Sequence, residues 1–182
     1  MEMRPQFQIQ TIIKAMTEDV IPALDQTNQL AMQSAQLTIG TLMLISQHLP
    51  LEYRYDCDEL TRLVATAEVL KSQAKAGETT SAAVACLKET ARSGADVLSR
   101  ARAEPAEILD AIHKLRASTS DIVRAVYAEG SEAAQSAVQA TVLAMSKDQL
   151  LRDRSWLLMQ GWEPDPKAVP AIDTLLAPIA KG

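Results

Sequence analysis

The chain has 182 residues and a mass of 19.8 kDa, and 47% of its residues are hydrophobic, which suits one folded domain with a sizeable core. Only 3% of the residues are aromatic but 29 are alanine, so aliphatic side chains and alanine must build that core. The net charge is −5 and the basic residues form no continuous stripe, which argues against nucleic-acid binding.

A first helix is predicted over residues 6–21, directly after Pro5. Its apolar side chains recur at steps of four, three and four residues, which places them on one stripe of a helix. This stripe consists of Ile9, Ile13, Met16 and Val20. Pro22 has no N–H to donate, so we expect it to end or kink this helix.

A second helix is predicted to follow the capping residues Asp25, Thr27 and Asn28 and to end before Pro50. Its apolar side chains project to every side, and a helix of this kind is usually buried all round. We therefore expect it to be the central, most buried helix, with Ser34 and Gly40 allowing neighbouring helices to approach closely.

Two further helices are predicted in the middle of the chain. Residues 50–58 have the character of a connector, and a third helix should span residues 58–76 before a stop at Gly77. A fourth helix should run over residues 79–102. It contains Gly94, which lowers helix stability by about 1 kcal/mol relative to alanine and could break the helix.

The strongest helical pattern begins at Pro105, a residue suited to the first turn of a helix. The pattern is a seam with heptad-like steps through Ile108, Ile112, Leu115, Thr119, Ile122 and Val126. Gly130 and Ser131 predict the end of a fifth helix and the start of a sixth that reaches about residue 160. The alternative is one rod over residues 105–160, about 80 Å long at 1.5 Å per residue, with alanines of residues 133–144 continuing the seam.

The composition changes after Gly161, because four of the last residues are prolines. One short helix is possible at residues 171–176. We therefore predict a helical bundle domain over residues 1–160 and a Pro-rich C-terminal tail over residues 161–182 that packs on the bundle or on a partner. The predicted fold class is all-α, an antiparallel helical bundle of five to seven helices with this tail.

The most unusual polar segment is residues 51–60, LEYRYDCDEL. Two interpretations compete. It could form a ligand-binding site at a helix N-terminus, where Arg54 meets an anion. It could instead be local structure, in which an aspartate caps the third helix and Glu59 pairs with Arg62. The candidate ligand-binding residues are Tyr53, Arg54, Tyr55, Asp56 and Asp58.

The densest apolar group near the C-terminus contains Trp156, Met159 and Trp162. These side chains could anchor the tail to the bundle. They could also form an interface with a second copy or another protein, because tryptophan is enriched at interaction hot spots.

No catalytic residue, metal site or cofactor is predicted. Glu107, Asp110 and His113 have a spacing that metal ligands use, but Asp110 and His113 point away from the apolar seam, and Asp110 can pair with Lys114. His48 lies in the last turn of the second helix, where it suits the helix C-terminus. No glycine-rich phosphate-binding loop is present.

The sequence predicts a cytoplasmic protein without a membrane span. Its two cysteines form no CxxC pair, and its first residues lack the features of a signal peptide. The most apolar run, residues 37–49, is shorter than the roughly 20 residues that a bilayer needs.

Three functions remain open from the sequence, and the weakest is a lipid-surface binder, because Ala-rich amphipathic helices can lie on membrane interfaces although their polar faces here are not rich in Lys and Arg. The first is a non-catalytic interaction or accessory protein that acts as a homo-oligomer, with a dimer preferred, and that could also bind another protein. The alternative is a helical bundle that binds a small molecule or a metal, or that is an enzyme, with its polar site around residues 53–59.

Overall fold

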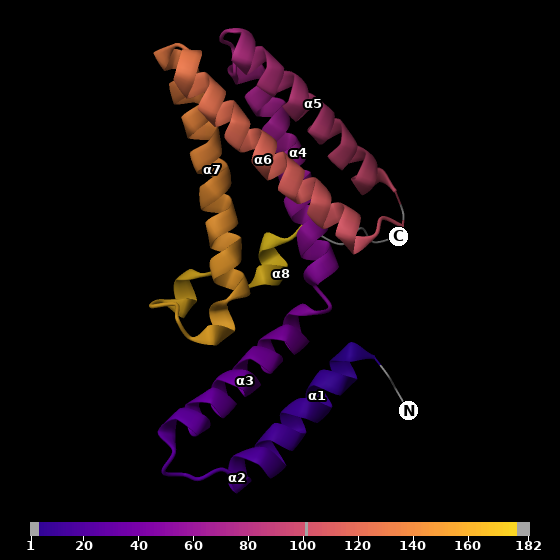
Figure 1. Ribbon diagram of the computed structural model, residues 1–182, viewed down its shortest axis with the longest axis vertical. Coiled ribbons are helices and arrows are strands. Elements are labelled where there is room, and N and C mark those ends of the chain that lie inside the picture. Colours follow the sequence, from indigo (N-terminus) through magenta and orange to yellow (C-terminus); the bar gives the residue numbers. More distant parts are fainter. Residues whose placement is uncertain (1–3, 101, 178–182) are drawn as a thin grey trace. The chain divides into compact units, whose positions relative to one another are not determined.

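The computed structural model describes residues 4–100 and 102–177, and it is all-α, as predicted (Figure 1). It is 83% helical and contains no strand within the described residues. Seven α-helices of four or more residues lie in this part of the chain, in agreement with the expected bundle of five to seven helices.

The chain divides into two compact units. Of the described residues, unit 1 contains 4–52 and 153–171, and unit 2 contains 53–100, 102–152 and 172–177. The sequence analysis places residues 1–160 in one bundle and residues 161–182 in a tail. That division stays a prediction, and residues 178–182 of the tail lie outside the described residues.

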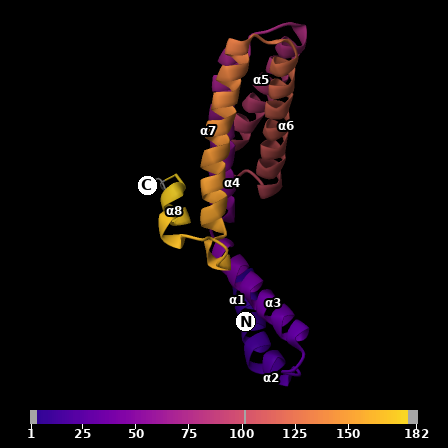
Figure 2. The ribbon, with the colours of Figure 1, turned by 90° about the vertical axis from the view of Figure 1, so that its left-hand side faces the viewer.

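Unit 2 is built from four long helices: α4 (Glu52–Gln73), α5 (Glu78–Ser99), α6 (Pro105–Glu129) and α7 (Glu132–Trp156). Short connections join consecutive helices, which gives the antiparallel arrangement seen in Figures 1 and 2. The predicted seam on α6 is confirmed, because every one of its six residues from Ile108 to Val126 is buried. The contiguous apolar core of the described chain lies in this unit.

Gly94 does not break α5, and the reason is packing. A Cβ atom added at Gly94 would lie 3.2 Å from Leu60 Cδ1 and 3.3 Å from both Leu115 Cδ1 and Val64 Cγ2. The glycine therefore lets α4 and α6 approach α5 closely. The packing offsets the unfavourable helix propensity of glycine, which is about 1 kcal/mol.

The predicted break between α6 and α7 is confirmed, and the single rod over residues 105–160 is wrong. A Cβ atom at Gly130 would lie only 2.5 Å from the carbonyl oxygen of Val126, so the chain can leave α6 in this way only with a glycine. The hydroxyl of Ser131 then accepts a hydrogen bond from the N–H of Ala134 at 3.3 Å and caps α7. The local residues thus encode both helix ends.

Unit 1 contains a helical hairpin formed by α1 (Pro5–Ala15) and α3 (Gln29–His48). Between them lie a π-helical turn (Met16–Val20) and the short α2 (Ile21–Ala23). The helical path that begins at Pro5 ends at Ala23, one residue after Pro22, in agreement with the expected end of the helix near this proline. Asn28 caps α3 by accepting a hydrogen bond from Ala31 N, as predicted.

The prediction that α3 is the central, most buried helix is wrong. Only Ala35 and His48 are buried on this helix, whereas Leu30 and Leu37 are 75% and 67% exposed. A Cβ atom at Gly40 would have no neighbour within 4 Å, so this glycine admits no close helix in the structure. Apolar side chains on every side allow a helix to be buried on every side. They do not show that other segments of this chain pack against it.

The last described segment returns to unit 2. Two 3₁₀ turns (Leu158–Gln160 and Pro166–Ala168) follow α7 within unit 1. The short helix α8 (Ile172–Leu175) then belongs to unit 2, close to the predicted range of 171–176. Leu176, directly after α8, is buried.

Candidate functional site

The predicted connector over residues 50–58 is wrong from residue 52 onward, because α4 starts at Glu52. Asp58 is therefore not an N-cap, since it lies more than one turn inside the helix and is buried. The predicted Glu59–Arg62 pair is also wrong. Glu59 pairs with Arg116 at 2.5 Å, and Arg62 pairs with Asp58 at 2.8 Å and Asp148 at 2.6 Å. The long-range partners Arg116 and Asp148 could not be identified from sequence spacing, whereas Arg62–Asp58 is a local i, i+4 pair.

Three charged side chains of α4 bind the main chain of residues 175–177. Asp58 Oδ1 accepts a hydrogen bond from the N–H of Ala177 at 3.0 Å. Arg54 Nη2 donates to the carbonyl oxygen of Ala177 at 2.5 Å, and Arg62 Nη2 donates to that of Leu175 at 3.0 Å. These residues are spaced four apart and share one face of α4. We call this group, together with Arg152, the α4 clamp.

Arg152 of α7 completes the clamp from the other side. Its side chain is fully buried, and its Nη2 lies 3.1 Å from Asp58 Oδ2 and 3.2 Å from the carbonyl oxygen of Tyr55. Its guanidinium group lies over the Tyr55 ring, 4.3 Å from the ring centroid, where a cation is favourable. Gln149 links the two residues, because it accepts from Arg152 Nη1 and donates to the hydroxyl of Tyr55.

The structure therefore brings Arg54, Tyr55 and Asp58 of the predicted ligand-binding residues into one network, around a segment of the chain itself. Tyr53 donates instead to the carbonyl oxygen of Ala103 at 3.2 Å, and Asp56 is only partly buried. Burial raises the pKa of the neighbouring Cys57 thiol, and the Asp56 carboxylate adds to this effect. The thiol therefore stays protonated and is a poor nucleophile.

The second candidate surface is apolar and belongs to unit 1. Ten of the sixteen exposed large hydrophobic side chains of the described chain lie in this unit, although it holds less than half of the residues. We call this group the unit 1 apolar surface; it comprises Phe7, Ile12, Val20, Leu30, Leu37, Met43, Ile45, Leu157, Met159 and Trp162. Ala35 and Val169 are the two apolar side chains that are buried among the described residues of this unit.

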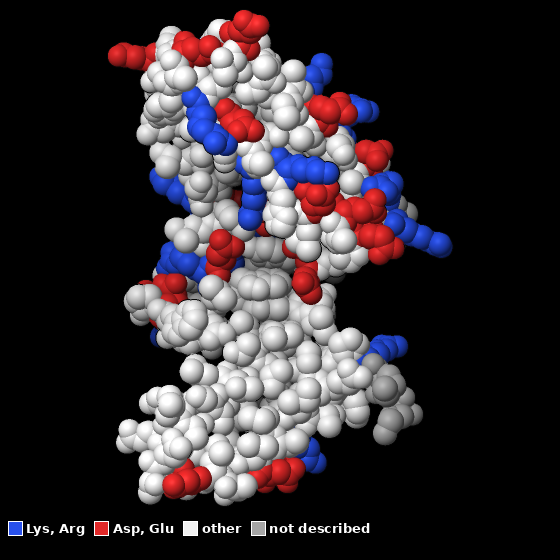
Figure 3. All heavy atoms as spheres, in the orientation of Figure 1, with Lys and Arg blue, Asp and Glu red and all other residues white. Residues whose placement is uncertain are grey.

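Unit 1 also has few charged side chains on α1–α3. Residues 26–51 contain no Asp, Glu, Lys or Arg, and this range includes all of α3. On the face shown in Figure 3, charged side chains gather over the four long helices, and the surface of α1–α3 is nearly all uncharged. On α3, Leu30, Leu37 and Leu44 recur every seven residues, a spacing that allows a helix to pack against another helix along one stripe.

Of the predicted interface residues, Met159 and Trp162 are exposed, and Trp162 is 72% exposed. Trp156 has a different environment, because its ring stacks on His48 of α3 with centroids 4.0 Å apart and planes at 27°. A small cavity of about 220 Å³ lies beside this pair, lined also by Leu44, Ile45, Leu49 and Glu52. Sequence spacing did not bring His48 and Trp156 together, since they are far apart in the chain.

Burial of His48 predicts a pH dependence. Desolvation lowers the pKa of His48 below its ordinary value near 6.5, so the folded protein holds the imidazole neutral where the unfolded chain would protonate it. The contribution of His48 to the free energy of unfolding is therefore fully present above about pH 6.5, and it is lost as the pH falls further. Trp156 contacts His48, so unfolding followed by tryptophan fluorescence between about pH 8 and pH 5 measures this loss.

The matched comparison is between His48→Gln and His113→Gln, since His113 is exposed on α6. His48→Gln should remove the histidine-dependent part of the pH profile, and His113→Gln should leave the profile as in the wild type. Equal profiles for the wild type and His48→Gln would contradict the prediction.

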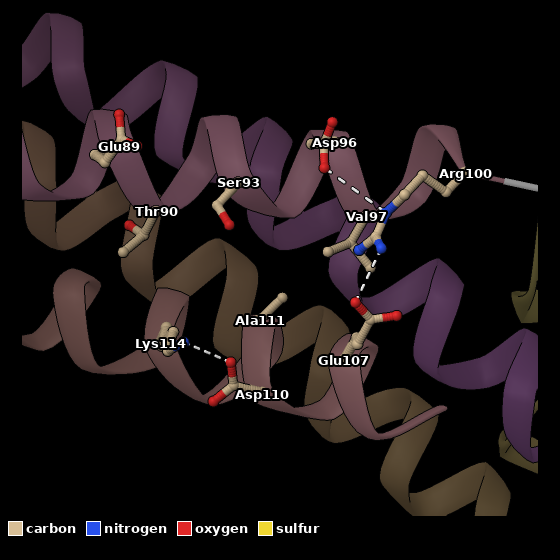
Figure 4. A pocket seen from close by; sticks show the side chains of 10 residues that line it. All are labelled: Glu89, Thr90, Ser93, Asp96, Val97, Arg100, Glu107, Asp110, Ala111 and Lys114. Atoms are coloured by element: carbon tan, nitrogen blue, oxygen red, sulfur yellow. Dashed lines mark hydrogen bonds and ion pairs between the residues drawn. The ribbon is translucent and has the colours of Figure 1, made fainter. Parts of the chain in front are cut away.

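A surface hollow of about 370 Å³ lies between α5 and α6 (Figure 4). Most of its charged side chains are paired with one another, and Glu89 pairs with Arg92 outside the hollow. Arg100 lies 2.9 Å from Glu107, and Lys114 pairs with Asp110 at 2.5 Å, as predicted from their i, i+4 spacing. These are solvated surface pairs of small energetic weight, about 0–1 kcal/mol each.

The described residues contain no group of three or more His, Cys, Asp or Glu side chains placed to hold a metal ion. None of the described helices is both long and apolar enough to cross a membrane. Comparison of the chain with protein-family models, with curated proteins and with solved structures gives no match.

Proposed function

We propose that this chain is a non-catalytic helical interaction protein that works as a homodimer, and that the unit 1 apolar surface is its self-association interface. The single observation that carries the proposal is the imbalance between the exposed and buried apolar side chains of unit 1. A helical hairpin with so few buried apolar side chains lacks the core that a stable unit needs. A second hairpin would supply that core.

The size of the surface supports a protein partner. With about 200 Å² for a fully exposed large apolar residue, the ten side chains present roughly 1,000 Å², and a standard interface buries about 800 Å² on each partner. The area is therefore sufficient for a stable dimer.

The lack of charge supports a second copy as the partner. In a symmetric dimer the same patch meets itself, so a charged patch would place like charges opposite one another. Residues 26–51 carry none of the four charged residue types, so the stripe on α3 can meet its own copy without repulsion. Ser34 and Gly40 have small side chains beside this stripe and would allow two α3 helices to approach closely.

The alternative function, a ligand-binding or enzymatic bundle around residues 53–59, receives less support. Its charged groups are engaged by the protein's own residues 175–177. A cytoplasmic location remains part of the proposal.

The test is the molar mass in solution, measured by light scattering at micromolar concentration. We expect the mass of a dimer for the wild type. Leu37→Glu should give a monomer, because it places a charge in the centre of the α3 stripe and a buried unpaired charge is strongly unfavourable, by several kcal/mol. At a dimer dissociation constant in the micromolar range, a loss of about 3 kcal/mol weakens association more than a hundredfold.

The matched control is Leu150→Glu, which changes an equally large and 58% exposed leucine of α7 in unit 2. This variant should remain a dimer. A wild-type monomer at concentrations of about 100 µM would overturn the proposal. If such a monomer floats with neutral phospholipid vesicles, the unit 1 apolar surface binds a membrane instead. If Leu150→Glu dissociates the dimer and Leu37→Glu does not, the interface lies on α7.

A further inference from the structure

The α4 clamp binds its segment through the main chain. The three groups that it holds, the N–H and C=O of Ala177 and the C=O of Leu175, are present in almost any peptide. Hydrogen bonds with a charged partner are about twice as strong as neutral ones. The clamp therefore recognises a short segment by its backbone, with little dependence on the side chains at those two positions.

Selectivity comes from the residue between them. Leu176 is only 4% exposed, while its neighbours in the chain, Leu175 and Ala177, are less buried. A backbone held at alternate positions and one buried apolar side chain are the two elements by which many proteins recognise peptides.

The segment depends on the clamp for its conformation. Helix α8 has four residues, which is far too short for a helix that is stable by itself. Eleven residues, with several prolines and one glycine, connect it to the end of the 3₁₀ turn Leu158–Gln160. The segment is thus a tethered peptide rather than an integral part of the four-helix core.

Three of the four clamp residues, in contrast, keep partners outside the segment. Asp58 keeps Arg62 and Arg152 as partners, Arg62 keeps Asp148, and Arg152 keeps Tyr55 and Gln149, all from α4 and α7. Each charged pair therefore persists when residues 175–177 leave. A site held by two long helices in this way is organised before its ligand binds.

We propose that the α4 clamp is a peptide-binding site of unit 2, that its ligands are short segments carrying a leucine, and that residues 172–177 are its exchangeable built-in occupant. A tethered segment has an effective concentration of about 1 mM at its site. The tail would thus keep weaker peptides out and admit those that bind more tightly or arrive when the tail is displaced.

The test uses the full-length chain and a fluorescein-labelled peptide with the sequence of residues 168–177, followed by fluorescence anisotropy. L176D removes the apolar anchor of the tail and should vacate the clamp, so the peptide should bind this variant at least about tenfold more tightly than the wild type. Adding R54A to L176D should weaken binding about tenfold through loss of the charged hydrogen bond. Adding R124A, an exposed arginine of α6 paired with Asp121, should leave binding unchanged.

The proposal is overturned if L176D keeps the circular dichroism of a folded helical protein and binds no peptide, because the clamp is then only a structural tie. It is also overturned if a peptide with the L176D change binds equally well, or if R54A and R124A act alike. If L176D does not fold, a second experiment uses a full-length chain with a protease site introduced at residues 163–165. This chain is cleaved at that site, and the exchange of its C-terminal fragment for the labelled peptide is measured. An absence of exchange contradicts the proposal. Neither result depends on dimer formation.

Discussion

Asp58→Ala is expected to destabilise unit 2 by about 3–5 kcal/mol, the largest effect of any single polar change in the described chain. Asp58 is buried and is the carboxylate that faces Arg152, whose side chain is fully buried. Its removal leaves that guanidinium group without its ion-pair partner and leaves the N–H of Ala177 without its acceptor. An uncompensated buried charge is much more unfavourable than the loss of one ordinary hydrogen bond.

Urea unfolding followed by far-ultraviolet circular dichroism measures this effect, because the helices of unit 2 contribute most of the signal. Both tryptophans lie in unit 1, so their fluorescence reports separately on that unit and should change less. The control is Asp148→Ala, which removes the other carboxylate bound to Arg62 at a half-exposed position and should change stability by less than about 1 kcal/mol. Equal losses of unfolding free energy for the two substitutions would show that the ion pairs of Asp58 contribute no more than a surface ion pair does.

Leu115→Ala is expected to destabilise unit 2 by about 2–5 kcal/mol. Leu115 lies in the middle of the α6 seam with no exposed surface, and its Cδ1 atom would be 3.3 Å from a Cβ placed on Gly94 of α5. Because backbone and side chains meet so closely here, removal of the leucine methyl groups leaves a cavity that neighbouring helices cannot fill without shifting.

The comparison variant is Leu109→Ala, the same substitution on the same helix at a 40% exposed position. It should change the unfolding free energy by less than about 1 kcal/mol, since a partly exposed side chain loses little burial. The midpoint of urea unfolding, followed by circular dichroism, distinguishes the two. A similar midpoint shift for both variants would mean that the seam is not the centre of the core.

Local patterns predicted the bundle of unit 2 well. The seam from Ile108 to Val126 is buried as expected, and Gly130 with Ser131 ends one helix and caps the next. Such features depend on residues within one or two helical turns, whose geometry is the same in every protein. The surface pair Asp110–Lys114 was predictable for the same reason.

The clamp was only partly predictable. The unusual polar composition of residues 51–60 indicates a role for Arg54 and Asp58. Local patterns, however, predict a connector over this segment and a helix cap at an aspartate such as Asp58. The partners that decide their roles, Arg152 and Ala177, lie about 100 residues further along the chain. No local spacing encodes which distant residues will meet.

The sequence alone was enough to establish that this chain is helical, where most of its long helices begin and end, and which side of α6 is apolar, because the periodicity of side chains around a helix is a local property. It could not show what covers each apolar side. The tertiary structure places a core against α6 and leaves α3 exposed, although both helices are rich in apolar residues. Burial depends on which surfaces meet in space, and contacts between distant segments decide that.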